Sequence, residues 1–562
     1  MLRTVNAQPT LWEAILPEMC LGMPSELEAV DRLLDDPAFF EPFRAHFHTA
    51  LGRPSVPIET YLRLMFLKYR YRLGFEPLCR EVADSISWQR FCRIPLGLDV
   101  PHPTTLMKIT TRCGSSAVDG LNETLLAKAQ AAKVLKTNKV RADTTVVPAN
   151  VAYPTDSGLL AKGVAKMAKG IEKLKGAGLA SKTTSRDRTR MMRARARSIG
   201  ANLRRRTGEA KDEVLAINAE MVRIAQTAVA EARQVAANAR RALKRLGNAA
   251  PGRLCAIADS LELTADRVDQ IAEQTDTRLR GEVPDGATRL VSLHDPDARP
   301  IRKGRLGKPV EFGYKAQVVD NEDGVVIDHN VEVGNPPDAP MLVPAVERVT
   351  HRAKRVPKAV TADRGYGETA VGEQLSALGV RTVVLPTKGK PSASRRAVES
   401  RPQFQRLVKW RTGSEGRISC LKRDFAWNRT QIDGIEGVRT WCGYGVFNHN
   451  LVKIGVDNLR VGRIGPTATR IGVNICPPAE RRWQPILIRE SLRLFQGEVV
   501  SGFESSHEGR SAFAVAHPDP ECRSRSSEKR RPIRQAGLSA PSRWHRLPPS
   551  APAGSWHRGQ SG

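Results

Sequence analysis

The sequence predicts a mixed α/β fold that a long helical segment interrupts. Three observations carry this prediction: the chain begins with α-rich patterns, strands and helices alternate over residues 288–390, and residues 159–280 contain almost no aromatic side chain. Alternating strands and helices are typical of a sheet covered by helices. With 562 residues, the chain is long enough for two to four domains.

The composition indicates a polyanionic partner. Lys and Arg number 89 against 59 Asp and Glu, which gives a net charge of +30. Basic side chains neutralise phosphates and release counterions, so nucleic acid is the first candidate and an acidic membrane surface the second. The sequence shows no run of 18 apolar residues, no signal peptide and no CxxC pair among nine cysteines. We therefore expect a cytosolic protein with reduced thiols and no membrane contact.

Residues 1–135 are predicted to form a helical DNA-binding domain. Apolar residues recur at helical spacing before and after Gly74, which gives two helices joined by a short turn. This arrangement suits a helix-turn-helix module, with Lys68, Arg70 and Arg72 placed for phosphate contacts. A plain helical bundle with a solvated basic face explains the same pattern, and the sequence leaves both interpretations open.

Residues 159–285 are predicted to form long paired helices, similar to a coiled coil. Helical spacing of apolar residues continues without a proline over residues 210–246. Residues 161–206 hold 15 Lys and Arg against 2 Asp and Glu, a local charge of +13. Such a segment suits contact with a DNA backbone, and a solvated helical arm is the alternative.

The remaining segments are predicted to build one sheet and its helices. Residues 136–158 supply its first strand, and residues 286–455 supply a hairpin followed by alternating helices and strands. Further helices are predicted at 402–425 and 437–454. The pattern then decays, and residues 456–562, rich in Ser, Pro and Arg, are expected to be mostly a disordered basic tail.

Three acidic residues stand out by their positions. Asp143 lies in the strand RADTTV, Asp363 ends the strand in AVTADRGYG, and Glu415 lies in the helix WRTGSEGRISCLK. An acid at the carboxyl end of a strand projects into a crevice of an α/β sheet. Three converging carboxylates suit one or two Mg²⁺ ions, which can activate a hydroxyl group and stabilise the leaving oxygen of a phosphodiester.

Arg411, Glu415 and Lys422 share one face of the predicted helix. At about 100° per residue, positions 4 and 7 apart differ in direction by about 40° or less. An acid between two bases could hold a metal ion while the bases hold phosphates. An exposed row of salt bridges is the other explanation. Two further acids are interpreted structurally, Asp156 as a turn or helix-start residue and Asp338 as the start of a helix.

Several segments together resemble transposases of the DDE type from insertion sequences, whose catalytic domain is RNase H-like. Residues 139–147 resemble the strand with the first Asp, and residues 359–367 the strand with the second. Arg411, Glu415 and Lys422 match the last three positions of the spaced Tyr-Arg-Glu-Lys signature. Residues 289–319 and 52–94 are similar to other parts of these enzymes, and the resemblance covers about residues 15–455.

The sequence departs from the family pattern in three places. Val408 holds the Tyr position of the signature, and 220 positions separate Asp143 from Asp363. The helical segment accounts for that separation as an insertion into the catalytic domain. The tail matches no part of the family, and one hypothesis is that it is a frameshifted or read-through end.

The resemblance implies a metal-dependent nuclease and strand transferase. Asp143, Asp363 and Glu415 would hold two Mg²⁺ or Mn²⁺ ions, and Arg411 and Lys422 would contact phosphate. Arg364 and Tyr366 in DRGYG are further candidates for DNA contact. The implied partner is double-stranded DNA, at the terminal repeats and the target site, and a homodimer is expected because two ends must be joined. The bacterial cytosol or nucleoid is the expected location. A catalytically inactive, DNA-binding transposase remnant is the alternative.

Overall fold

The structure is a computed structural model that describes residues 2–3, 15–17, 22–49, 51–303 and 309–463. For residues 248 and 456–463 it describes the backbone alone. The segment 464–562, which holds nearly all of the predicted tail, lies outside the described residues. None of the described helices is both long enough and apolar enough to cross a membrane.

The N-terminal region is helical, as predicted. Its elements are α3 (Ser25–Leu34), η1 (Pro37–Phe39), α4 (Glu41–Arg44), α5 (Ile58–Arg70), α6 (Phe75–Ala83), α7 (Ile86–Phe91) and α8 (Pro103–Ala131). Helices α5 and α6 are separated by a short turn that contains Gly74. Every α5 residue from Ile58 to Tyr69 is buried, so α5 is a central helix of a bundle with other elements on all of its sides.

The burial of α5 corrects one predicted DNA contact. Lys68 is 1% exposed, and its ammonium group donates a hydrogen bond to the Leu73 carbonyl at 3.1 Å. The same group lies 4.5 Å from the centre of the Trp441 ring. A phosphate has no access to it there. The spacing of residues in the sequence could not show that Lys68 is buried, because a basic residue at helical spacing has the same pattern on a solvated face and under a covering helix.

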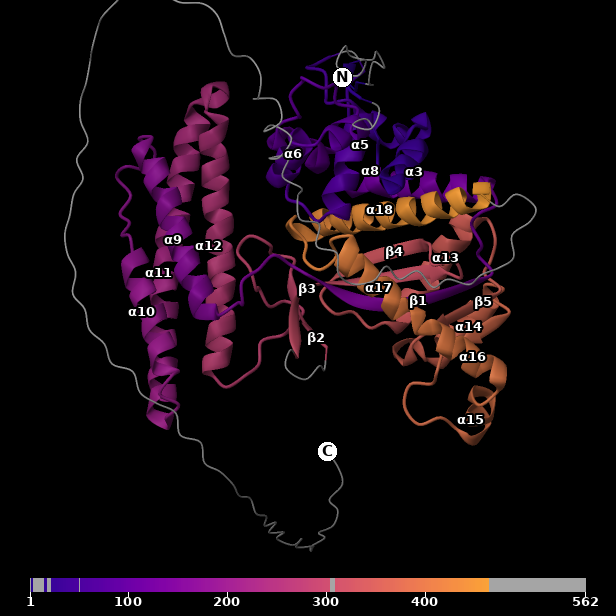
Figure 1. The fold of residues 1–562 in the computed structure, drawn as a ribbon. Coiled ribbons are helices and arrows are strands. Elements are labelled where there is room, and N and C mark those ends of the chain that lie inside the picture. The colour runs from indigo at the N-terminus through magenta and orange to yellow at the C-terminus, as the bar shows by residue number, and fades with distance from the viewer. Residues whose placement is uncertain (1, 4–14, 18–21, 50, 304–308, 464–562) are drawn as a thin grey trace, which may run out of the picture. The chain divides into compact units, whose positions relative to one another are not determined.

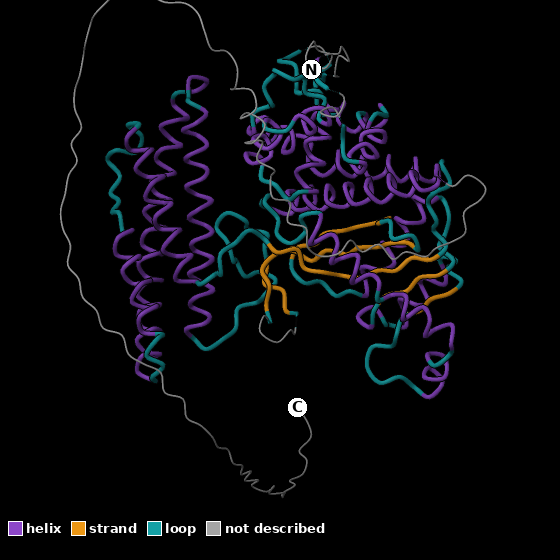
Figure 2. Tube along the Cα trace, viewed as in Figure 1, coloured by secondary structure: helices purple, strands orange, loops and turns teal. Residues whose placement is uncertain are grey.

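The sheet joins strands that lie far apart in the sequence. Its strands are β1 (Lys139–Pro148), β2 (Arg299–Arg302), β3 (Val310–Asn321), β4 (Val326–Val333), β5 (Ala359–Ala362) and β6 (Thr382–Val384). Strand β1 pairs antiparallel with β3 and parallel with β5, and β6 continues in parallel beyond β5. On the other side of β3, β2 and β4 pair antiparallel with successive parts of that strand. The strands gather into one mixed sheet (Figure 2).

Helices from the second half of the chain pack against this sheet or against one another. They are α13 (Ala339–Ala353), η3 (Arg364–Tyr366), α14 (Thr369–Ala377), α15 (Ala393–Glu399), α16 (Pro402–Arg411), α17 (Gly413–Asp424) and α18 (Gly434–Arg463). Helix α18 lies between the N-terminal helices and β4 (Figure 1). Its Trp441 ring packs 4.8 Å from Tyr69 of α5. The N-terminal helices and one face of the sheet therefore share a hydrophobic core.

The predicted single helix over residues 402–425 is wrong in one respect, because it is two helices. Helix α16 ends at Arg411, and α17 begins at Gly413 after the junction residue Thr412. The glycine at the start of α17 is the residue that weakens continuous helix formation. The last helix also differs from the prediction, since α18 extends to Arg463.

Between β1 and β2 the chain forms long helices with a core of their own. They are α9 (Asp156–Gly176), α10 (Thr189–Asn202), α11 (Gly208–Arg245), η2 (Gly247–Ala249) and α12 (Gly252–Leu279). Asp156 is the first residue of α9, as its interpretation as a helix-start residue requires. It is buried and accepts a hydrogen bond from Gln274 while pairing with Arg278 at 2.9 Å. It thereby links the first helix of this segment to the last.

Candidate active site

Asp143 and Asp363 lie side by side on neighbouring parallel strands. In the register of β1 and β5, Ala142 is paired with Ala362, and each aspartate is the next residue along its strand. Asp363 directly follows the end of β5 and caps η3, where its carboxylate accepts a hydrogen bond from the Gly365 amide at 2.9 Å. Backbone pairing of two interior strands thus places two carboxylates, separated by 220 positions in the sequence, next to each other.

Both carboxyl groups are harder to ionise than usual. Burial raises the pKa of Asp143 to about 6, with a further contribution from the negative charge of Asp363, while Arg411 acts in the opposite direction. Burial also raises the pKa of Asp363, and the neighbouring carboxylate of Asp338 adds to this effect. The site therefore concentrates negative charge in a largely desolvated place, which is an arrangement that a cation stabilises.

Arg411 and Glu415 face the two aspartates from the junction of α16 and α17. The Arg411 guanidinium donates to the Asp143 carboxylate at 3.3 Å and lies 3.6 Å from that of Glu415. The side chain of Glu415 is 71% exposed, whereas that of Asp143 is 12% exposed. The arginine thus bridges a buried acid and an exposed one. Asp143 and Glu415 were expected to lie together, and in the structure both contact the Arg411 side chain.

A buried ion pair between Arg141 and Asp320 positions the junction of α16 and α17 on the sheet. Arg141, two residues before Asp143 on β1, pairs through two nitrogens with the carboxylate of Asp320 on β3, at 2.9 and 2.7 Å. Its third nitrogen donates to the Trp410 carbonyl at 2.7 Å, and its guanidinium stacks on the Trp410 ring. Gly413 lies so close that a Cβ atom there would collide with the Arg141 guanidinium. Arg141 therefore fixes the end of α16, and with it the position of Arg411.

Asp338 is a fourth acid at the site, although its position in the sequence favours a structural role. It does begin a helix, as predicted, because it is the N-cap residue of α13. Its carboxylate also accepts a hydrogen bond from the Thr144 hydroxyl at 2.9 Å and pairs with Lys315 at 2.7 Å. Thr144 follows Asp143, so Asp338 borders the first aspartate as well as the second. In the sequence, Asp338 is an acid that follows a predicted loop. An acid in such a position ordinarily indicates the start of a helix.

The residues at this site fit a divalent cation only in part. Among the residues that the structure describes, no three Asp, Glu, His or Cys side chains already lie in position to hold a metal ion. The buried Asp143 and the partly buried Asp363 nevertheless lie next to each other, and the charge of Asp363 contributes to the raised pKa of Asp143. Oxygen ligands of this kind suit Mg²⁺. Glu415 would complete the set once Arg411 no longer lies between it and Asp143.

The other predicted DNA contacts have mixed positions. Arg364 is exposed beside Asp363, and Lys422 is half-buried on α17. Tyr366 is fully buried and its hydroxyl accepts a hydrogen bond from Gln317, so the prediction that it contacts DNA does not fit its position. Tyr366 is the last residue of η3, and its ring packs in the hydrophobic core.

Arg70, the last residue of α5, and Arg72, two residues beyond it, also differ from each other. Arg70 pairs with both carboxylate oxygens of Glu26, at 2.7 and 3.1 Å, and Arg72 is exposed with a positive φ of 56°. Of the three basic residues predicted in this segment, Arg72 is the one whose side chain is presented to solvent.

Comparison with known proteins agrees with this architecture. Residues 286–451 match the family described as "Transposase DDE domain", which includes Asp363 and Glu415. Residues 18–112 match the family described as "Transposase domain (DUF772)". Two separate parts of the chain thus match transposase families. Together these matches support a DDE-type transposase of an insertion sequence.

One relative adds little about activity. An uncharacterized protein from Rhizobium meliloti, described as ORF8 in the nfe locus, is 29% identical over 124 residues. The aligned stretch covers 21% of this chain and 59% of that protein. No solved structure matches the chain.

Proposed function

We propose that this protein cuts DNA at the ends of an insertion sequence and joins the freed ends to target DNA. The catalytic domain would be RNase H-like, with Asp143, Asp363 and Glu415 as the acidic triad. The observation that carries the proposal is the pairing of Ala142 with Ala362, because the first two acids are the residues that follow these two alanines. The family matches supply the reaction class.

Asp143, Asp363 and Glu415 would hold two Mg²⁺ or Mn²⁺ ions. Bound there, the ions would activate the attacking hydroxyl and stabilise the leaving oxygen of a phosphodiester. Asp143 and Asp363 would supply the ligands from the sheet, and the exposed side chain of Glu415 would reach the site from the first turn of α17. Asp338 and Lys315 would orient Thr144 and the strand next to Asp143.

Arg411 and Lys422 would bind the phosphates of the scissile strand. Arg411 already lies at the carboxylates, so a phosphate held by its guanidinium would be adjacent to Asp143. Val408 takes the place of the tyrosine of the family signature, so any contact made by a phenol hydroxyl there is lost in this chain. A homodimer in the bacterial cytosol would bring two DNA ends together.

Strand cleavage in the presence and absence of Mg²⁺ tests this proposal. The substrate is a duplex that carries the genomic sequence flanking the gene, and the full chain is assayed. Wild type should cut it with Mg²⁺ and not with EDTA, and Asp143→Asn should abolish cleavage. Asp212→Asn, at an exposed site on α11, is the matched control and should retain activity.

Two further measurements separate the alternatives. Mn²⁺ binding by calorimetry should weaken in Asp143→Asn and stay unchanged in Asp212→Asn. If wild type binds the duplex but neither cuts it nor binds Mn²⁺ more tightly than Asp143→Asn, the protein is the inactive DNA-binding remnant. Light scattering of the DNA complex tests the homodimer.

A further inference from the structure

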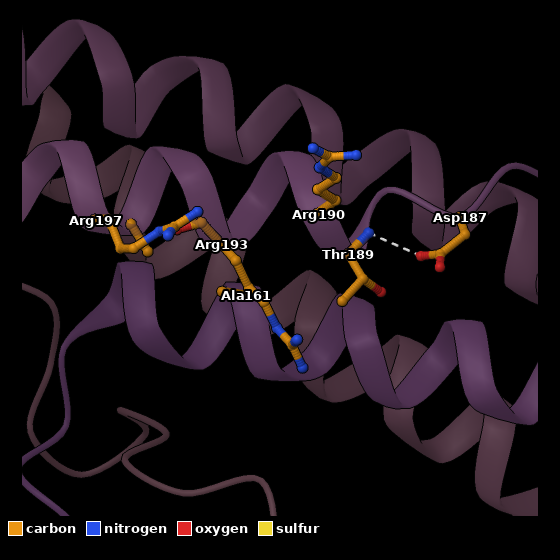
Figure 3. Close-up of a pocket in the computed structure, with 7 residues that line it drawn as sticks. Ala161, Asp187, Thr189, Arg190, Arg193 and Arg197 are labelled. Atoms are coloured by element: carbon orange, nitrogen blue, oxygen red, sulfur yellow. Dashed lines mark hydrogen bonds between the residues drawn. The ribbon is translucent and has the colours of Figure 1, made fainter. Parts of the chain in front are cut away.

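A basic groove runs along the helical segment between β1 and β2, outside the candidate active site. Helix α10 packs against α9 there, and the groove has a volume of about 670 Å³. Arg190, Arg193 and Arg197 line it from α10, together with Ala161 of α9 (Figure 3). Asp187 is its one acidic lining residue, and that carboxylate accepts a hydrogen bond from the Thr189 amide.

A second groove continues the first along α9. Its volume is about 300 Å³, and it shares Ala161 and Arg193 with the first groove. From α9 it adds three lysines, Lys162, Lys166 and Lys169. We call the two together the basic groove, defined by these three lysines and by Arg190, Arg193 and Arg197.

The charges of α10 are sorted between two faces. On the face toward α11, Arg188 pairs with Glu231 at 2.7 Å and Arg195 with Glu220 at 2.8 Å. None of the six cations of the basic groove forms an ion pair with an acidic side chain in the described part of the chain. Arg188 and Arg195 thus stabilise the packing against α11. The six cations of the basic groove remain to interact with a partner outside the segment.

The spacing of the six cations matches a phosphodiester backbone. Arg190, Arg193 and Arg197 are 3 and 7 positions apart, so they share one helix face, and the three lysines are 4 and 7 positions apart on α9. Seven residues of helix span about 10.5 Å. One strand of duplex DNA carries about three phosphates over that length of its axis.

The composition of the segment distinguishes duplex from single-stranded nucleic acid. Residues 156–285 contain no Phe, Trp or Tyr. Recognition of single-stranded RNA or DNA commonly stacks bases on aromatic rings, and this surface has none to offer. A duplex presents its phosphates outward and needs no stacking partner.

We propose that the basic groove binds the phosphate backbone of double-stranded DNA, away from the carboxylates that would cut it. The proposal rests on the proposed function, since the substrate of a transposase is duplex DNA. The helical segment then holds DNA on either side of the cleavage point without reading its sequence, because phosphate contacts position a protein without specifying bases.

The salt dependence of binding tests the groove directly. A fluorescein-labelled 30-bp duplex of mixed sequence is titrated with the full-length protein between 50 and 300 mM NaCl. The triple variant Arg190→Ala, Arg193→Ala, Arg197→Ala should make the slope of log K against log [salt] shallower by about 2.7, from three contacts at about 0.9 each. The second triple variant Lys162→Gln, Lys166→Gln, Lys169→Gln should do the same, which guards against a folding defect in the first.

The matched control removes the same charge elsewhere in the segment. Lys211→Ala, Lys244→Ala, Arg245→Ala alters three exposed residues of α11 outside the groove and should leave the slope unchanged. If the groove variants and this control change the slope equally, the proposal is overturned. It is also overturned if unlabelled single-stranded RNA of equal length displaces the probe better than unlabelled duplex does.

The outcome is separable from that of the proposed function. Asp143→Asn should keep the wild-type salt slope while losing Mg²⁺-dependent cleavage. A shallower salt slope in the groove variants, with no cleavage by wild type, would support DNA binding by the basic groove and refute the transposase activity. Cleavage by wild type, together with an unaltered salt slope in the groove variants, would support the transposase activity and refute DNA binding by the basic groove.

Discussion

The Arg411 guanidinium lies 3.3 Å from the carboxylate of Asp143, across 268 residues of sequence. It also lies 3.6 Å from Glu415, so one cation bridges two of the three acids proposed to hold metal. A guanidinium and a divalent cation would compete for the same negative charge. We therefore expect that removing Arg411 raises the affinity for metal, whereas removing a residue from an active site usually lowers it.

Removing the Arg411 charge should strengthen metal binding. In Arg411→Gln, Asp143 loses its cationic partner, so Mn²⁺ affinity measured by calorimetry should rise roughly 5-fold, which corresponds to about 1 kcal/mol. DNA cleavage should fall, because the proposed phosphate contact is lost. Arg406→Gln, at an exposed site on the same helix, is the control. Unchanged or weaker Mn²⁺ binding in Arg411→Gln would show that the arginine does not compete with the metal.

Asp338 should act on the metal site from beside it. Asp338→Asn keeps the shape of the side chain but removes the charge that holds Lys315 and accepts from Thr144. Groups that orient metal ligands typically account for a 10- to 100-fold effect, and we expect a decrease of roughly that size in Mg²⁺-dependent cleavage and in Mn²⁺ affinity. DNA binding in EDTA should match that of Asp212→Asn. A loss of cleavage with full Mn²⁺ affinity would instead indicate that Asp338 acts on the DNA.

Two glycines of α17 should respond in opposite ways to alanine. Gly413→Ala places a Cβ against the Arg141 guanidinium, so it should destabilise the protein by about 1–3 kcal/mol and displace Arg411 from Asp143. Gly416→Ala meets only open space and should stabilise α17 by up to about 1 kcal/mol. Urea unfolding and cleavage rates measure both effects. Similar results for the two variants would mean that Arg141 does not fix the junction.

The buried Lys68 should make stability depend on pH. Burial lowers its pKa to about 7 in the folded protein, from an ordinary value of 10.5. Between these values the unfolded chain binds the proton and the folded protein does not, so stability rises with pH. From pH 7 to pH 9, the free energy of unfolding of wild type relative to Lys68→Met should therefore rise by about 2 kcal/mol.

Urea unfolding at the two pH values measures this difference, and comparison with Lys68→Met cancels the titration of other groups. Lys108→Met, at an exposed site of α8, is the control and should show the same difference from wild type at both values. An equally constant difference for Lys68→Met would contradict the prediction, and it would indicate that the rings around Lys68 keep its ammonium charged in the folded protein.

Local patterns in the sequence were enough for the class of fold, and they selected Asp143, Asp363 and Glu415 as the candidate acids. Alternation of strands and helices gave the mixed sheet, and helical spacing gave the N-terminal helices and the long helices after β1. Asp363 and Glu415 lie within the matched DDE domain. Asp143 lies outside that match, and its place beside Asp363 depends on the parallel pairing of β1 with β5.

The tertiary structure decided which side chains are accessible and what they contact. Lys68 and Tyr366 had the chemistry of DNA-binding residues, but other elements cover them, and a pattern of spacing carries no information about what lies opposite a helix face. Asp338 had the position of a helix start, and only the fold of the chain brings it to Asp143. Arg141 and Asp320 look like two unrelated charges in the sequence until strand pairing buries them together. The sequence by itself therefore determined the residue types and the elements that carry them, because both follow from short-range periodicity. The composition of the site was decided by long-range strand pairing and burial, which no local pattern encodes.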